Sequence, residues 1–193
     1  RRHTRYPLVT GVQTCALPIY RSGVSGIRWN LVGKPLPDLD APQTAALVDR
    51  VKGLGWQIEI QRGAADLVPL ARRLVDRGVP VVVDHWGLPD PQLGVAAPGF
   101  ADLLDLGRTG RVWIKISGVY RNGAEGRAFA HAAWPLVRAT FGLDRTIWGS
   151  DWPHTQFEAT ETYARNRAFL DELVPDAAER ARILAAPRAL FRL

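Results

Sequence analysis

Two hydrophobic patterns alternate along the chain from Tyr20 onward. Short runs rich in β-branched and aromatic residues predict strands at 26–32, 56–61, 79–85, 111–117 and 145–151. Longer runs with helical spacing, several closed by glycine, predict helices at 41–55, 64–78, 99–110, 128–141, 157–174 and 176–186. Strands that alternate with helices indicate an α/β fold with parallel strands and right-handed crossovers.

Alternate positions within the predicted strands differ in polarity. Successive side chains of a strand point to opposite faces, and a face covered by helices must be apolar. One set of positions meets that requirement: Ile27, Trp29, Ile58, Ile60, Val112, Ile114 and Ile116. The other set is polar in three strands: Arg28, Asn30, Gln57, Glu59, Gln61, Lys115 and Ser117. In the strand at 79–85, Val81 and Val83 would share a face with His85, so only the end of that face is polar.

The polar strand positions decide between two architectures, an open doubly wound sheet and part of a (β/α)8 barrel. No predicted strand is followed by a glycine-rich phosphate loop. An open sheet with helices on both faces has no place for so many polar side chains. A barrel has one, because its lumen opens into a catalytic mouth at the carboxyl ends of the strands. The pattern therefore favours part of a barrel.

Composition narrows the class of protein. The 193 residues are 47% apolar and 23% charged, which is ordinary for a globular domain, and no apolar run is long enough to span a bilayer. The net charge of +6 falls to +3 without residues 1–19, and no basic stripe is interleaved with aromatics, so we expect neither nucleic acid nor membrane partners. Cys15 is the only cysteine, so we expect no disulfide, no thiolate metal site in the domain, and a cytoplasmic location.

The segment "VTGVQTCALPI" at 9–19 follows a basic opening and fits neither pattern. It superficially resembles a secretory signal, although polar residues interrupt its apolar run. Residues 8–12 alone could form a buried strand. The whole string also resembles the translation of a short-read sequencing adapter fused to a gene fragment. We interpret 1–19 as a non-native segment and 20–193 as the partial barrel domain.

Candidate site residues lie at the ends of the predicted strands, which meet at the mouth of a barrel. His85, Ser117 and Asp151 end three strands, and the loop residues Arg121 and His154 lie just beyond. Structural alternatives exist for each functional interpretation. His85 could be a buried structural histidine, and Asp151 in "SDWP" could cap a turn. Arg28 could pair with Glu59 on the next strand, Arg121 could be solvated, and His154 could only line the mouth.

Four segments, "GIRWNL", "VVVDHWGLPD", "VWIKISGVYR" and "IWGSDWPH", resemble amidohydrolase-related metal-dependent hydrolases of the TIM-barrel type. The nearest branch contains the 2-pyrone-4,6-dicarboxylate lactonases and sugar-acid lactonases. The segments occur in family order, so the resemblance implies the C-terminal five βα units of a (β/α)8 TIM barrel, an incomplete barrel. The family's His-x-His pair and fifth-strand histidine are missing, and "WQIEIQ" offers Glu59 instead.

The resemblance also implies a chemistry, the hydrolysis of a lactone, or cyclic ester, of a carboxylated small molecule. Asp151 would act as general base on a water, and His85 would polarise the carbonyl or hold one divalent metal such as zinc. Of the family's metal ligands only His85 and Asp151 remain, and the lactonase branch includes metal-independent members, so the cofactor stays open.

The rest of the predicted site binds substrate. Arg28 and Arg121 would hold a substrate carboxylate, which suits the guanidinium fork. Gln61, Ser117 and His154 complete the predicted substrate-binding set. The alternatives are decarboxylation of an aromatic or ene acid, or an inactive fragment or sugar-acid binding module. The oligomeric state stays open.

Overall fold

A computed structural model describes residues 23–191 and shows one parallel sheet. Its strands lie in chain order, and each pairs with the next in parallel. They are β1 (Gly26–Asn30), β2 (Gln57–Gln61), β3 (Val81–Val83), β4 (Val112–Lys115) and β5 (Thr146–Ile147). The predicted α/β class with parallel strands is confirmed.

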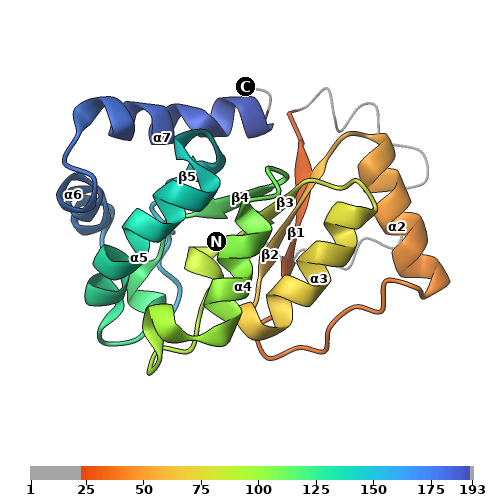
Figure 1. Ribbon diagram of the computed structural model, residues 1–193, viewed down its shortest axis with the longest axis horizontal. Helices are drawn as coiled ribbons and strands as arrows, with labels where there is room; N and C mark the ends of the chain where they lie inside the picture. Colours follow the sequence, from red (N-terminus) through yellow and green to blue (C-terminus); the bar gives the residue numbers. More distant parts are fainter. Residues whose placement is uncertain (1–22, 192–193) are drawn as a thin grey trace.

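Helices follow each strand, as predicted. Four of them lie side by side over one face of the sheet (Figure 1): α2 (Pro42–Gly53), α3 (Ala64–Asp76), α4 (Pro98–Gly107) and α5 (Gly126–Phe141). Two more end the chain, α6 (Tyr163–Leu173) and α7 (Ala177–Phe191). Short 3-10 turns link these elements: η1 (His85–Gly87), η2 (Gly94–Ala96), η3 (Val119–Asn122) and η4 (Leu143–Arg145).

Several element bounds differ from the predictions. Helix α6 begins at Tyr163 rather than at 157, because the Thr162 hydroxyl accepts a hydrogen bond from the Arg165 N–H and caps the helix there. Strand β3 ends at Val83, and the backbone turns into the left-handed region at His85, with φ of 48°. His85 therefore does not continue the alternation of Val81 and Val83. The prediction that it shares their face of the strand is wrong.

The helix-covered face of the sheet is the main hydrophobic core. Six strand residues on it are fully buried: Ile58, Ile60, Val81, Val83, Val112 and Ile114. They pack in one cluster with apolar residues of α3 and α4, including Leu67 and Leu103. Burying one such side chain stabilises the fold by about 1.5–3 kcal/mol. The apolar set of strand positions is thus confirmed as the helix-facing set.

Part of the opposite face is apolar. There Val82 and Ile147 pack against Ala186 and Leu190 of α7, which crosses one end of the sheet (Figure 1). We name these four residues the apolar end. In the strand register Val82 is paired with Glu59 and Ile147 with Lys115, so charged side chains lie beside them on the same face. One face of the sheet therefore carries two different environments.

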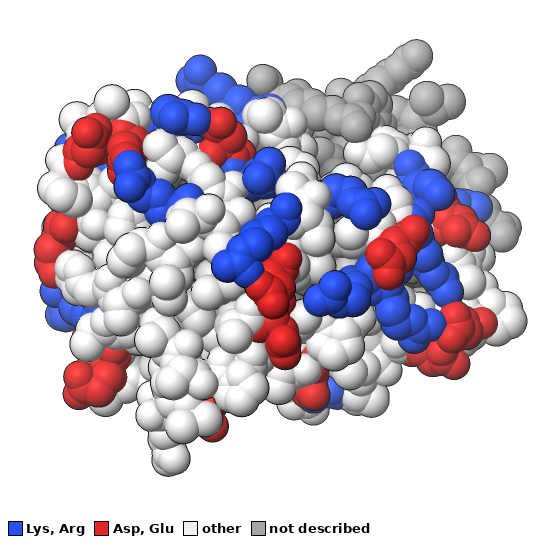
Figure 2. Space-filling model, in the orientation of Figure 1, with Lys and Arg blue, Asp and Glu red and all other residues white. Residues whose placement is uncertain are grey.

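Charges of both signs lie on the helix-covered side of the molecule (Figure 2). Figure 2 shows basic and acidic side chains interspersed over the helix-covered side rather than gathered into one stripe. Within residues 23–191, no helix is both long and apolar enough to cross a membrane.

Candidate active site

Four charged side chains form a layer on the polar face of the sheet: Arg28, Glu59, Asp84 and Lys115. Arg28 and Glu59 are direct neighbours in the strand register. Arg28 lies 2.7 Å from a Glu59 oxygen and 2.6 Å from Asp84 Oδ2. Lys115 Nζ lies 2.6 Å from the other Glu59 oxygen and 3.2 Å from Asp84 Oδ1. Each carboxylate thus contacts both cations, and we call these four residues the ion-pair layer.

The two carboxylates of this layer are buried but differ in electrostatics. Burial alone would raise the pKa of Asp84, but Lys115, His85 and Arg28 together lower it below its usual value. The pKa of Glu59 is raised, first by burial and then by repulsion from Asp84, while Lys115 opposes the rise. Lys115 thus lowers the pKa of both acids and favours their charged forms.

A second cluster, which we call the mouth cluster, lies just beyond the strand ends. It contains His85, Ser117, Tyr120, Arg121 and Asp151. The His85 Nε2 atom lies 3.6 Å from Asp151 Oδ1, and His85 Nδ1 lies 3.0 Å from the Ser117 hydroxyl. Asp151 Oδ2 accepts hydrogen bonds from the Tyr120 hydroxyl at 2.6 Å and from Arg121 Nε at 2.5 Å. Asp151 Oδ2 therefore accepts two hydrogen bonds, and Oδ1 faces the imidazole ring of His85.

Burial sets the protonation states around Asp151. It lowers the pKa of His85, and the nearby Asp84 and Asp151 only partly oppose this, so the ring is neutral at neutral pH. Burial also raises the pKa of Tyr120, and the hydrogen bond to Asp151 raises it further. The tyrosine hydroxyl thus keeps its proton and donates a hydrogen bond to the carboxylate.

The backbone around the mouth cluster is unusual. Three non-glycine residues of the candidate site have positive φ: His85 at 48°, Asp151 at 59° and His154 at 61°. Such conformations cost roughly 1–3 kcal/mol each and gather at functional sites. His85 and Asp151, which have two of these conformations, are the residues whose side chains meet at 3.6 Å.

The structure brings most of the predicted site residues together. His85, Ser117, Arg121 and Asp151 form the mouth cluster with Tyr120. His154 is buried beside it, with Nδ1 3.2 Å from the Tyr120 hydroxyl. The mouth cluster and the ion-pair layer touch where His85 Nε2 lies 3.9 Å from Asp84 Oδ2.

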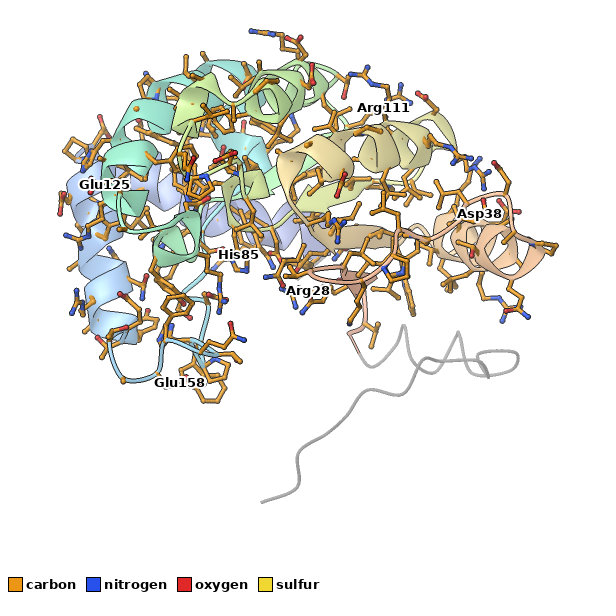
Figure 3. The ribbon with its side chains drawn as sticks, turned by 90° about the horizontal axis from the view of Figure 1, so that it is seen from below. Arg28, Asp38, His85, Arg111, Glu125 and Glu158 are labelled. Atoms are coloured by element: carbon orange, nitrogen blue, oxygen red, sulfur yellow. The ribbon has the colours of Figure 1, made fainter. Side chains whose placement is uncertain are left out.

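Arg28 and Gln61 lie in or beside the ion-pair layer rather than at the mouth. Arg28 Nη2 donates to Gln61 Oε1 at 2.7 Å, and the same guanidinium pairs with Glu59, which is the structural alternative considered from the sequence. Seen along the strands, the elements form an arc, and Arg28 and His85 lie on its inner side (Figure 3). Arg28 is thus near the site, with much of its guanidinium already engaged.

Two important residues of the site were missed as site residues from the sequence. Asp84 lies on the polar face because it follows Val82 by two positions, so strand alternation could have located it. Tyr120 follows a turn at Gly118, where no periodic pattern applies, so only its place beside Arg121 could have suggested a role.

The described residues do not fit a complete catalytic metal site. A catalytic zinc usually has three protein ligands and a water. Within residues 23–191, no group of three or more His, Cys, Asp or Glu side chains could hold a metal ion. His85 and Asp151 supply only two of the required donors, and we derive no catalytic step through a metal.

Comparisons with known proteins identify the family of this chain. A family model described as Amidohydrolase matches residues 19–193. The chain belongs to the amidohydrolase family. Among curated members, it is 31% identical to the 4-sulfomuconolactone hydrolase of Hydrogenophaga intermedia, covering 76% of this chain and 51% of that protein. It is 32% identical to the D-galactarolactone isomerase of Agrobacterium fabrum, covering 77% and 52%. The chain thus spans about half the length of these curated relatives.

Solved amidohydrolase structures superpose closely on the chain. A candidate 2-pyrone-4,6-dicarboxylic acid hydrolase from Pseudomonas putida has a TM-score of 0.86 and 40% identity, over 91% of this chain and 66% of that one. A second candidate hydrolase of that name, from Acinetobacter baumannii with citric acid bound, has a TM-score of 0.86 and 34% identity, over 92% and 67%. A dihydroxybenzoic acid decarboxylase from Polaromonas is only 16% identical, so it shares the fold alone.

Proposed function

We propose that residues 20–193 are the C-terminal five βα units of an eight-stranded TIM barrel, and that residues 1–19, all of which lie outside the described residues, are not native. Within residues 23–191, β1 and β5 each pair with a strand on one side only. The share of the solved relatives that the chain covers is close to that expected for five of eight units.

Expression of the 193-residue chain by itself tests this architecture. Unpaired strand edges invite association with other chains. We expect the isolated chain to be insoluble or to lack a cooperative thermal transition. A monomer with a sharp melting curve would contradict the partial-barrel proposal.

We also propose that the complete protein hydrolyses a lactone of a carboxylated small molecule. The observation that supports this most directly is the pair formed by Asp151 Oδ1 and the neutral His85 ring, 3.6 Å apart at the strand ends. Asp151 Oδ1 takes a proton from a water, and the water oxygen forms a bond to the lactone carbonyl carbon. The ring C–O bond then breaks, and the proton held by Asp151 passes to the departing ring oxygen.

The cationic groups near the pair fit an acidic substrate. Arg121 and Arg28 each have part of a guanidinium engaged by a carboxylate, and Arg121 is only partly buried. His154 and Ser117 line the same mouth. The names of the relatives include a lactone hydrolase and a lactone isomerase, and one solved relative holds citric acid. A lactone that carries a carboxylate is therefore the substrate class we propose.

A cytoplasmic location stays a prediction.

An assay of the complete protein tests the reaction. The uninterrupted gene supplies the missing strands, and the purified protein is incubated with 2-pyrone-4,6-dicarboxylate, 4-sulfomuconolactone and D-galactarolactone in turn. Ring opening and carbon dioxide release are followed separately. We expect ring opening of at least one lactone without carbon dioxide. Carbon dioxide release would favour the decarboxylase alternative, and binding without turnover would favour a binding protein.

A further inference from the structure

Gly118 lies at the point where three side chains of the mouth cluster converge. A Cβ atom at this position would lie 2.8 Å from His85 Nδ1, 2.9 Å from Asp151 Oδ2 and 3.2 Å from Arg121 Cδ. The first two distances are shorter than Cβ atoms tolerate. The φ angle of +56° also disfavours any residue with a side chain. The absence of a side chain here is what allows histidine, aspartate and arginine to meet.

The same glycine begins the turn that carries two of the donors. Strand β4 ends shortly before it, and the Gly118 carbonyl accepts a hydrogen bond from the Arg121 N–H at 2.8 Å to close η3. This tight turn presents Tyr120 and Arg121 to the same oxygen of Asp151. Gly118 therefore provides both the space for the Asp151 carboxylate and the turn that orients its two donors.

The result is a carboxylate with two inequivalent oxygens. Oδ2 accepts two short hydrogen bonds, one of them from a cation, which uses its lone pairs. Oδ1 faces His85 at a distance longer than a normal hydrogen bond, which leaves it able to accept from a water.

We propose that Gly118 and Tyr120 are positioning residues that fix the rotation of the Asp151 carboxylate, so that Oδ1 alone is presented to the water. The proposal rests on the proposed function, because it assigns the reacting atom of the general base. Neither residue need contact the substrate. Gly118 provides the space, and Tyr120 provides a neutral donor that holds Oδ2 beside Arg121.

Substitution of Gly118 by alanine has a matched control in this chain. Gly142 has a similar φ of +69°, but a Cβ there would meet nothing within 4 Å. Gly118→Ala and Gly142→Ala both place alanine at a positive φ, and only the first crowds the mouth cluster. The ψ of 172° at Gly142 is the less favourable for alanine, because Gly118, with ψ of 44°, lies in the left-handed helical region. In the complete protein we expect Tm to fall in both variants, with kcat lowered about a hundredfold only in Gly118→Ala. Equal kcat in the two variants would overturn the role of Gly118.

Removal of the Tyr120 hydroxyl tests the other half of the proposal. In Tyr120→Phe we expect kcat to fall about tenfold. KM should stay within about twofold, because the substitution removes no contact with the bound substrate. Tyr163→Phe, at an exposed position, is the control and should change neither constant. A rise in KM with unchanged kcat would mean that Tyr120 binds substrate, and the positioning role would be wrong.

Crystal structures of the complete protein and its variants separate this proposal from the proposed function. We expect the Asp151 carboxylate to rotate and the His85 Nε2 to Oδ1 distance to change in Gly118→Ala and Tyr120→Phe, but not in Gly142→Ala. That result, with no lactone hydrolysed by the unmodified protein, would reject the reaction and keep the positioning role. An unchanged carboxylate in both variants would reject the positioning role whatever the activity.

Discussion

The ion-pair layer on the sheet and the mouth cluster just beyond the strand ends lie next to each other, yet their charges are arranged differently. In the ion-pair layer, both oxygens of Glu59 and both oxygens of Asp84 lie near a cation. In the mouth cluster, Asp151 has one oxygen held by two donors and one that faces a neutral ring. Charges that satisfy one another hold strands together, whereas an acceptor left available beside a neutral histidine is suited to chemistry.

This comparison predicts that substitutions in the ion-pair layer mainly lower stability, whereas substitutions in the mouth cluster mainly lower turnover. Removal of one member of a buried ion pair leaves its partner uncompensated, which destabilises the fold strongly. Replacement of a reacting group by an isostere changes the barrier of the reaction instead. Variants in one layer should therefore change the property that variants in the other leave nearly intact.

The largest effect should follow from Asp151→Asn in the complete protein. The amide keeps the shape of the side chain but cannot accept a proton from water, so we expect kcat to fall about a thousandfold or more. The amide can still accept the hydrogen bonds of Tyr120 and Arg121 but loses the charge that pairs with Arg121, so we expect Tm to fall by less than in Lys115→Met and ligand affinity to be largely kept. Kinetics and calorimetry on the same preparation measure both. Turnover near that of the unmodified protein would show that Asp151 is not the base.

A smaller effect, but on stability, should follow from Lys115→Met. The substitution keeps most of the side chain's volume and leaves Glu59 and Asp84 with Arg28 as their only cation in the layer. We expect the free energy of unfolding of the complete protein to fall by about 3 kcal/mol, measured by denaturant titration. The double variant Lys115→Met with Glu59→Gln should recover part of that loss. A loss unchanged in the double variant would show that the layer is not coupled in this way.

Strand alternation in the sequence was enough to predict the two faces of the sheet. Ile58 and Ile60 face the helices, and Arg28 and Glu59 face each other on the opposite side, because the period of two is fixed by the geometry of a strand. Alternation predicts nothing beyond the end of a strand. His85 has a left-handed backbone conformation, which the sequence pattern does not predict.

The donors around Asp151 could not be predicted from the sequence for a related reason. Tyr120 reaches its place through a glycine turn, and its contact with Asp151 joins residues 31 positions apart. Such a contact depends on the packing of β4 against β5 rather than on spacing. The start of α6 at Tyr163 likewise depends on a single cap at Thr162 inside a polar loop.

The apolar end offers a contrast to the ion-pair layer on the same face. Leu190 of α7 is 8% exposed and packs against Val82 and Ile147. We expect Leu190→Ala to lower the free energy of unfolding by about 2 kcal/mol, at the low end for such substitutions because the site is near the end of a helix. Leu184, on the same helix but 41% exposed, is the control, and Leu184→Ala should cost less than about 0.5 kcal/mol. Equal losses would mean that α7 does not seal this end of the sheet.

Arg28 lies at the boundary between the two layers, and Arg28→Gln should have the smallest effect on stability. Its side chain is 43% exposed, so solvent screens its ion pairs, and we expect a loss of only about 1 kcal/mol, well below that of Lys115→Met. Its Nε and Nη2 atoms contact Glu59, Asp84 and Gln61, which leaves Nη1 for a substrate carboxylate. If Arg28 also binds substrate, KM rises about tenfold while kcat stays near that of the unmodified protein. Arg182→Gln, which removes an exposed pair with Asp144, is the control and should alter neither KM nor kcat. Unchanged KM in Arg28→Gln would assign this arginine wholly to the ion-pair layer and leave Arg121 as the carboxylate ligand of the mouth.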